Sequence, residues 1–300
     1  MIRVLLVGCG DVAMRAADLL AGRARLVGLT RRADDVAKLR LHGVAPIVGD
    51  LDALRTLARL RLAPFAVMHF APPPAEGRGD PRTRRLIAAL SAARSIPRRF
   101  VYVSTSGVYG DCAGARIDES RPRRATSARA RRRVDAEDRL RAWAAQRGVA
   151  LSIVRAPGIY AENRLPLERI RQQTPALVDE HDVYTNHIHA DDLARVAVAA
   201  LFRGRANRAY HASDDAELRM GQWFDAVADA HGLPRPPRVT RDEAEQRIAP
   251  ALLSFMSESR RLSNLRMKRE LRVKLRYATP QAMFAGAASR ARRRQMPLTF

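Results

Sequence analysis

Short apolar runs rich in Val, Ile and Leu recur along the first half of the chain, separated by segments with helical periodicity. Continuous apolar runs, as opposed to alternating ones, are typical of strands that are buried on both faces. The runs occupy residues 2–8, 24–30, 44–50, 65–71, 99–106 and 149–157, and the helical segments occupy 11–22, 34–42, 51–62, 82–94 and the stretch that follows Pro122. Strands that alternate with helices at this spacing predict an α/β fold with a parallel sheet covered on both sides.

The pattern changes beyond Pro157. Residues 186–204 read as a strand and then a helix whose N-terminus Asp191 or Asp192 could cap. A strand is expected at 207–213, an amphipathic helix at 220–234, and further helical segments within 240–256 and 264–271. We therefore expect residues 1–155 to form the sheet domain, with 186–204 returning to it. Residues 156–185 and 205–285 are expected to form a small α+β lobe, and 286–300 a basic, mobile tail.

The composition is that of a globular protein without membrane or metal signatures. Hydrophobic residues make up 47% of the 300 residues, but no apolar run approaches the ~20 residues needed to cross a bilayer. The first apolar run is too short for a signal peptide. Cys9 and Cys112 show neither disulfide nor metal spacing, and His187 and His189 have no carboxylate or cysteine at ligand spacing. A cytoplasmic protein with no metal and no membrane partner is expected.

The net charge is unusually high, at +23. A polyanion partner is one interpretation, because clustered basic residues attract nucleic acid. Only Lys38, Lys268 and Lys274 are lysine, however, and the arginines are interleaved with acidic residues except at 121–133 and 290–294. This pattern indicates a compositional bias toward arginine as readily as a function. Because no aromatic platforms accompany the charge, nucleic-acid binding is the less favoured interpretation.

A glycine-rich turn follows the first apolar run, in the segment VGCGDVA (7–13). In a strand–turn–helix context, such a turn binds a dinucleotide: the first glycine permits the tight turn, the second lets the backbone approach a diphosphate, and a small third residue lets helix and strand pack closely. The start of the helix then presents free N–H groups to the phosphates. The residues in these roles are Gly8, Gly10, Asp11, Val12 and Ala13. The sheet domain is therefore predicted to be a Rossmann-type, doubly wound domain.

The end of the second strand bears on which dinucleotide binds. An acidic residue there would accept from the ribose 2′-hydroxyl of NAD, but the chain has Thr30, Arg31 and Arg32. Two guanidinium groups suit a 2′-phosphate, so NADP is favoured and NAD remains the alternative. Asp50, at the end of the third strand, could accept from the adenine amino group or simply cap the following helix.

Several motifs together resemble the extended and atypical short-chain dehydrogenase/reductase superfamily, the NAD(P)-dependent epimerase/dehydratase family. They are VGCGDVA, VGDL, VYVSTSGVYGD (101–111), IVRAPGIYAENR (153–164) and NHIHADDLA (186–194). The resemblance implies a Rossmann domain with a C-terminal substrate lobe, and places Ala71 and Pro157 against the cofactor. It is also compatible with a homodimer.

The family's chemistry implies a Ser or Thr after the fifth strand and a Tyr-x-x-x-Lys pair on the next helix, in which the tyrosine is the acid/base. Thr105 matches the hydroxyl position. Counting from Glu137, Arg133 occupies the lysine position and Arg129 the tyrosine position. Arginine stays protonated near neutral pH and cannot act as a general base. Hydride transfer is therefore expected to be altered or absent, unless Tyr109 or Tyr160 reaches the site in place of the expected tyrosine or the reaction needs no such base.

The preferred hypothesis is an NADP-binding oxidoreductase-like protein similar to sugar-nucleotide epimerases and dehydratases, with a small anionic or nucleotide-linked substrate. Arg133 would still hold a ribose hydroxyl, and Arg155 is either an anion contact or part of a structural ion pair. The alternative is a catalytically silent NAD(P)-binding protein with a regulatory or redox-sensing role. A nucleic-acid-binding protein that uses the basic surface is the third hypothesis.

Overall fold

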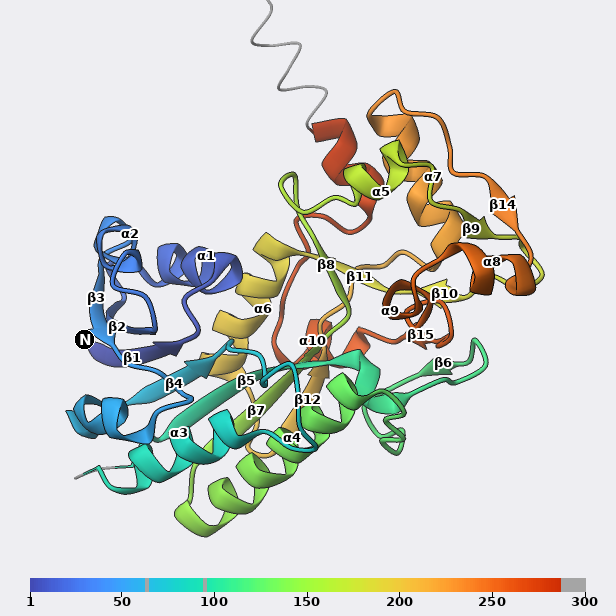
Figure 1. The fold of residues 1–300 in the computed structure, drawn as a ribbon. Coiled ribbons are helices and arrows are strands. Elements are labelled where there is room, and N and C mark those ends of the chain that lie inside the picture. Colours follow the sequence, from blue (N-terminus) through green and yellow to red (C-terminus); the bar gives the residue numbers. More distant parts are fainter. Residues whose placement is uncertain (63–64, 94–95, 287–300) are drawn as a thin grey trace, which may run out of the picture.

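A seven-stranded parallel sheet is the central element of the described residues, which are 1–62, 65–93 and 96–286 of this computed structural model (Figure 1). The strand order is β3-β2-β1-β4-β5-β7-β12. The strands are β1 (Ile2–Val7), β2 (Ala24–Thr30), β3 (Val44–Val48), β4 (Ala66–His69), β5 (Arg99–Thr105), β7 (Ala150–Ala156) and β12 (Arg208–His211). The predicted doubly wound α/β fold is confirmed, and its strand order reverses between β1 and β4.

Helices cover both faces of the sheet, as the apolar runs predicted. One face carries α1 (Asp11–Leu20), α2 (Asp35–Leu41) and α6 (Ala190–Arg203), and the other carries η1 (Leu54–Leu62), α3 (Pro81–Ser91) and α4 (Ala128–Arg147) (Figure 1). Along β1, Val4 and Leu6 pack on the first face, and Leu5 and Val7 pack on the second. Each such side chain contributes about 1.5–3 kcal/mol of transfer free energy on burial, so these runs hold both layers to the sheet.

Two elements differ from the expectation. The segment 207–213 was assigned to the small lobe, but β12 pairs in parallel with β7 and forms the last strand of the central sheet. Helix α10 (Leu265–Glu270) packs against β12, and its Met267 is buried in the core on the same face of the sheet as α1 and α6. The predicted helix at 51–62 is the 3₁₀ helix η1, which begins only at Leu54, because helical periodicity alone does not separate a 3₁₀ helix from an α-helix.

The remaining elements lie at the carboxyl end of the sheet (Figure 1). They include the paired strands β8 (Gly158–Tyr160) and β11 (His187–His189), β10 (Tyr184–Thr185) with β13 (Leu218–Arg219), and β9 (Ala176–Leu177) with β14 (Arg238–Val239). Strand β6 (Arg116–Ile117) pairs with β15 (Arg261–Leu262), and the helices are α5 (Leu167–Arg171), α7 (Met220–Ala230), α8 (Arg241–Arg247) and α9 (Pro250–Leu253). The tail expected at 286–300 falls, after Gly286, outside the described residues.

The N-terminus of α6 is capped differently from the expectation. The His189 ring, and not Asp191 or Asp192, accepts the hydrogen bond from the backbone N–H of Asp191, at 3.1 Å. Asp192 instead accepts from the backbone N–H groups of Arg276 and Tyr277, at 2.8 Å each. The carboxylate therefore ties the C-terminal segment to the helix.

Within the described residues, no helix combines the length and apolarity that a membrane span requires.

Candidate nucleotide and substrate site

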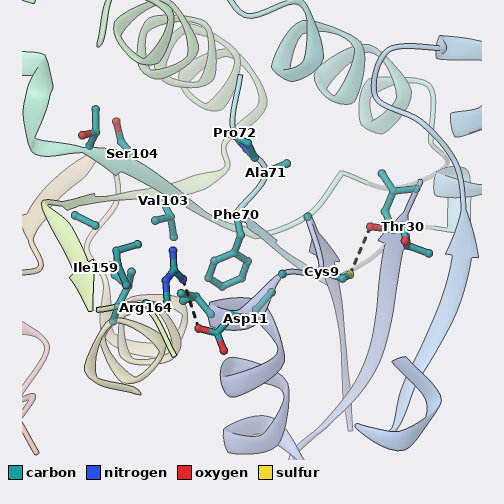
Figure 2. Close-up of a pocket in the computed structure, with 18 of the residues that line it drawn as sticks. Cys9, Asp11, Thr30, Phe70, Ala71, Pro72, Val103, Ser104, Ile159 and Arg164 are labelled. Carbon is teal, nitrogen blue, oxygen red and sulfur yellow. Dashed lines mark hydrogen bonds and ion pairs between the residues drawn. The ribbon is translucent and has the colours of Figure 1, made fainter. Parts of the chain in front are cut away.

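A cavity of about 580 Å³ opens where the carboxyl ends of the central strands meet, at the β1–β4 reversal (Figure 2). We call it the glycine-turn cavity. Its wall comes from the loops after β1, β2, β4, β5 and β7, and from the segment after β8. Of the cofactor contacts expected from the sequence, those that line it are Gly8, Gly10, Asp11, Val12, Ala13, Arg31, Arg32, Ala71 and Pro157. Open α/β sheets bind ligands at this position.

The two glycines of the turn are required for different reasons. Gly8 has φ of +84°, and a Cβ atom there would lie 2.5 Å from the backbone nitrogen of Ala71. Gly8 is therefore dictated by the fold. Gly10 has φ of −81°, and a Cβ atom there would meet no protein atom within 4 Å. Neither backbone conformation nor packing requires Gly10 to be glycine, so the open space above it fits the close approach of a ligand.

The N-terminus of α1 faces the same space. No side chain caps the helix, so its first N–H groups are available to an anion and carry the positive end of the helix dipole. The Asp11 carboxylate is neutralised by Arg15, with Nε 3.0 Å from Oδ1, and by Arg164, with Nη1 3.4 Å from Oδ2. In Figure 2 the Arg164 side chain extends toward Asp11 across the cavity. Arg164 was not anticipated from the sequence.

The part of the cavity beyond β2 combines two exposed arginines with two groups that the sequence analysis missed, Asp35 and Cys9. Arg31 and Arg32 are exposed, and Arg32 lies 3.7 Å from Asp34. Asp35 also lines the cavity and accepts a hydrogen bond from the Thr30 hydroxyl at 3.1 Å. Burial, with a contribution from Asp35, raises the pKa of the Cys9 thiol to about 12, so Cys9 is a neutral wall residue.

Asp50 does not line the cavity. Its Oδ1 atom accepts a hydrogen bond from the backbone N–H of Asp52 at 2.8 Å, and its own N–H donates to the Thr56 hydroxyl at 2.7 Å. These contacts form a local turn before η1 (Leu54–Leu62), so Asp50 neither lines the cavity nor caps that helix, the two roles expected from the sequence. The physical reason is that a short Asp side chain reaches backbone donors two residues ahead more readily than a distant ligand.

A second cavity, of about 370 Å³, adjoins the first and shares Thr105 and Pro157 with it. We call it the arginine-lined cavity, because Arg129, Arg169 and Arg260 lie in its wall. Its aromatic wall includes Trp223, Phe224 and Phe255, and its polar wall includes Tyr184, His187 and Glu258. Thr105 thus contributes to the walls of both cavities.

Thr105 and Arg133 both line the glycine-turn cavity. Thr105 ends β5, and its hydroxyl accepts from the backbone N–H of Gly107 at 3.2 Å while facing both cavities. Arg133 lines the glycine-turn cavity, and its Nη1 donates to the Val103 carbonyl at 2.8 Å and to the Tyr102 hydroxyl at 3.0 Å. Burial raises the pKa of Tyr102 to about 12, so the phenol stays neutral beside this guanidinium.

Arg129, at the expected tyrosine position, lies in the arginine-lined cavity. Its Nη1 donates to the Ser254 hydroxyl at 3.0 Å, and its guanidinium carbon lies 3.8 Å above the centre of the Phe255 ring. Burial lowers the pKa of Arg129, but a guanidinium remains protonated under ordinary conditions. Arg129 therefore presents a fixed positive charge to the cavity.

Tyr109, the expected catalytic tyrosine, does not reach the candidate site. It lines neither cavity, and its hydroxyl lies 2.6 Å from Arg155 Nη1 and 2.6 Å from His211 Nε2. Burial raises the pKa of Tyr109 to about 12 despite the adjacent Arg155. The reason is local: the loop after β5 closes into the 3₁₀ turn η2 (Ser106–Tyr109), which turns this ring into the protein. The expected catalytic role of Tyr109 is not compatible with this placement.

Tyr160 is also buried and lines neither cavity. Burial and the nearby Asp214 carboxyl raise the pKa of its phenol, and burial likewise raises the pKa of Asp214 well above its usual range. The tyrosine that does line a cavity is Tyr184, in the short strand β10. No sequence signal marks Tyr184, because its position depends on how the lobe packs against the sheet.

The histidines of the HIH segment have structural partners. The His187 ring stacks on Trp223 with ring centres 4.2 Å apart, and burial lowers the pKa of His187 to about 3, so it is neutral. His189 caps α6. In the part of the chain that the structure describes, no three His, Cys, Asp or Glu side chains form a metal-binding group.

The sheet order and the position of the cavity are those of a Rossmann-type nucleotide-binding fold. The model of the NAD dependent epimerase/dehydratase family matches residues 12–213, which is more than half of the chain, so the chain belongs to this family. No curated protein matches the sequence.

Solved structures of similar proteins cover nearly the whole chain. A functionally unknown conserved protein from Silicibacter pomeroyi has 28% identity and a TM-score of 0.79, with 97% of this chain and 99% of that chain covered. A nucleoside-diphosphate-sugar epimerase from Pseudomonas aeruginosa has 18% identity and a TM-score of 0.78, with 98% of each chain covered. A dTDP-glucose 4,6-dehydratase from Streptomyces venezuelae, solved with NAD bound, has 21% identity and a TM-score of 0.76, with 97% and 98% covered.

Proposed function

We propose that this protein binds NADP in the glycine-turn cavity and an anionic, nucleotide-linked substrate in the arginine-lined cavity, as an oxidoreductase-like member of the epimerase/dehydratase family with an altered acid/base site. The observation that carries the proposal is the open space above Gly10, which neither backbone conformation nor packing explains. The Streptomyces venezuelae dehydratase, whose structure contains NAD, has the same fold.

The residues present fit a dinucleotide along the whole cavity. The glycine turn and the N-terminus of α1 would hold the diphosphate, and Arg133 would hold the nicotinamide ribose. Pro157 and Ala156 would back the nicotinamide ring. When bound, the nicotinamide supplies a site that accepts or donates hydride. The hydroxyl of Thr105, which lines both cavities, would orient a substrate carbonyl toward it.

The charges at the two ends of the site support the finer parts of the proposal. Arg31 and Arg32 lie at the adenosine end, where NADP carries its additional phosphate. Arg129, Arg169 and Arg260 lie in the other cavity, which also contains Glu258, 2.9 Å from Arg260. The surplus of positive charge there favours an anionic substrate, and the aromatic wall offers stacking surface for a base or sugar.

The proposed cofactor is tested by titrating purified, nucleic-acid-free protein with NADPH, NADP, NADH and NAD while its thermal stability is measured. Saturable stabilisation that is larger for the phosphorylated pair is expected.

Arg31→Ala/Arg32→Ala should weaken NADP binding roughly 10- to 100-fold and change NAD binding by less than about threefold, because two charge-assisted hydrogen bonds to the 2′-phosphate are lost.

The matched control is Arg23→Ala/Arg25→Ala, which removes two exposed arginines from the opposite end of β2 and changes the net charge equally. If both double variants lower NADP affinity to the same extent, the effect is one of overall charge, and the assignment of Arg31 and Arg32 to the 2′-phosphate fails. If none of the four nucleotides stabilises the protein, the proposed cofactor is wrong.

The proposed substrate class is tested with UDP as the probe. Arg129→Ala is expected to weaken UDP binding about tenfold, since a charge-assisted hydrogen bond from a guanidinium to an anion typically contributes more than 1 kcal/mol. Arg131→Ala is the control, because Arg131 lies on the same helix but lines neither of the two cavities. Equal affinities for UDP in wild type and Arg129→Ala would contradict an anion-binding role for Arg129.

A catalytically silent NAD(P)-binding protein is the second candidate function. It is favoured by the placement of the candidate acid/base residues: Arg129, at the position where the resemblance expects a tyrosine, lines the arginine-lined cavity, and Tyr109 and Tyr160 line neither cavity. Incubation with NADP or NADPH and carbonyl or nucleotide-sugar substrates, followed both by cofactor absorbance and by conversion of the substrate, separates the two candidates, because a reaction that returns the hydride leaves the cofactor unchanged. Steady turnover that Thr105→Ala abolishes supports the enzyme, whereas tight binding of NADPH without turnover of any substrate supports the silent protein.

A further inference from the structure

Arg164 reaches the diphosphate-binding end of the glycine-turn cavity from a different part of the fold. It lies between β8 and α5, in a turn closed by a hydrogen bond from its own N–H to the Ala161 carbonyl at 2.9 Å. Its guanidinium nevertheless lies against Asp11, the first residue of α1, and lines the cavity beside the glycine turn (Figure 2). The chain thus places a positive charge opposite the N-terminus of α1.

The contact that holds Arg164 there is weak and replaceable. Within the described residues, the Arg164 guanidinium makes one hydrogen bond, from Nη1 to Asp11 Oδ2 at 3.4 Å, and its side chain is 38% exposed. Asp11 has a second, closer partner in Arg15, whose Nε lies 3.0 Å from Oδ1. If Arg164 moved away, Asp11 would still be paired. Four of the five guanidinium N–H groups remain available to another acceptor.

We propose that Arg164 is a cofactor-binding residue that exchanges Asp11 for the diphosphate of the bound dinucleotide. This inference rests on the proposed function. In the empty site Asp11 holds the guanidinium beside the position of the diphosphate, which is the stronger acceptor because it carries two charges and suits a bidentate arginine contact. The bound cofactor would thereby link the segment between β8 and α5 to the glycine turn. The affinity for NADP would then depend on Arg164 as well as on the glycine turn and α1.

The first test is calorimetric titration of the full chain with NADP. Arg164→Ala is expected to weaken binding at least tenfold, the usual consequence of losing a charge-assisted contact to phosphate. Arg171→Ala, an exposed arginine at the end of α5 that lines neither cavity, should stay within twofold of wild type. The melting temperature of the ligand-free protein should not change, because the Arg164–Asp11 pair is exposed. Arg164→Gln is a second variant that decides the result if Arg164→Ala does not fold.

A double-mutant cycle with Asp11→Asn tests the exchange itself. Asp11→Asn should raise NADP affinity by freeing Arg164 and by removing a negative charge beside the diphosphate. Only the first contribution disappears in the Arg164→Ala background, so the gain from Asp11→Asn must shrink there by about threefold or more. Equal gains in both backgrounds would overturn the exchange.

The outcomes separate this inference from the proposed function. If wild type binds NADP and both Arg164 variants bind it equally well, the inference on Arg164 is wrong and the proposed cofactor stands. If wild type binds neither NADP nor NAD, the proposed cofactor is wrong and the inference on Arg164 is overturned with it.

Discussion

Replacing Glu137 with alanine is expected to lower the free energy of unfolding by about 3–5 kcal/mol, the usual cost of leaving a buried charge without its partner. Glu137 is fully buried in α4 and forms an ion pair with Arg155 of β7, with Nη2 2.7 Å from Oε2 and Nε 3.1 Å from Oε1. The Ser104 hydroxyl donates to the same carboxylate at 2.7 Å. The pair therefore joins α4 to two central strands, and Arg155 has a structural role.

The charge of Arg155 would remain in the core of the Glu137→Ala variant. Its Nη1 also donates to Tyr109, at 2.6 Å, and only 3% of its side chain is exposed, so water does not replace the lost carboxylate. The double variant Glu137→Leu/Arg155→Met removes both charges and should lose less stability than Glu137→Ala, although the Tyr109 and Ser104 hydroxyls then lack a partner.

The ion pair also gives stability a dependence on pH. Burial alone would raise the pKa of Glu137, but hydrogen bonds and charge from Arg155, with help from Ser104, outweigh it and hold the pKa below its usual range. The native state then binds fewer protons than the unfolded state between the two pKa values. This stabilisation is present above the usual glutamate pKa and is lost as the pH falls toward the folded value. In Glu137→Gln that part of the acid sensitivity should disappear.

Urea unfolding followed by circular dichroism measures these changes, and Asp138→Ala is the matched control. Asp138 is the next residue on α4 and pairs with Arg123 at 2.6 Å, but its side chain is 53% exposed. Its loss should cost less than about 1 kcal/mol. If Glu137→Ala and Asp138→Ala lowered the free energy of unfolding by similar amounts, the buried Glu137–Arg155 pair would contribute no more to stability than an exposed pair, and the prediction would be wrong.

The sheet and the glycine turn could be predicted because their signals are local. A strand buried on both faces must be a short apolar run, and a turn with positive φ next to a second backbone must be glycine, as Gly8 shows. Strand β12 was recognised as a strand but assigned to the wrong part of the fold. Its short sequence, RAYH, carries no signal for a particular sheet, and its partner β7 lies more than fifty residues earlier.

The site residues that sequence analysis missed come from loops whose positions depend on long-range packing. Tyr184 and Arg164 carry no local signal that would direct them to a cavity, since their segments are short and irregular. The direction of Tyr109 was equally undetermined, because it depends on Arg155 and His211 from distant strands. The arginines at 129 and 133 could be placed correctly on the cavity walls because one regular helix fixes their spacing.

Introducing valine at Gly10 is expected to weaken binding of NADP roughly 100-fold or more while leaving the fold intact. A Cβ atom at Gly10 would meet no protein atom within 4 Å, and the backbone there already has φ of −81°, which valine adopts readily. Its methyl groups would instead occupy the cavity beside the N-terminus of α1. A diphosphate displaced from that helix end loses several charge-assisted hydrogen bonds, each contributing about 1.5–3 kcal/mol.

Gly8→Ala is the matched comparison. In the same turn, this substitution should lower the stability of the fold, whereas Gly10→Val should lower the affinity for NADP. A Cβ atom at Gly8 would lie 2.5 Å from the Ala71 nitrogen, and φ of +84° is strained for any other residue, so a loss of about 1–3 kcal/mol or more is expected. Melting temperatures without ligand and calorimetric titrations with NADP measure the two effects separately. If Gly10→Val binds NADP as tightly as wild type, the diphosphate does not lie over this turn, and the proposed cofactor site must be abandoned.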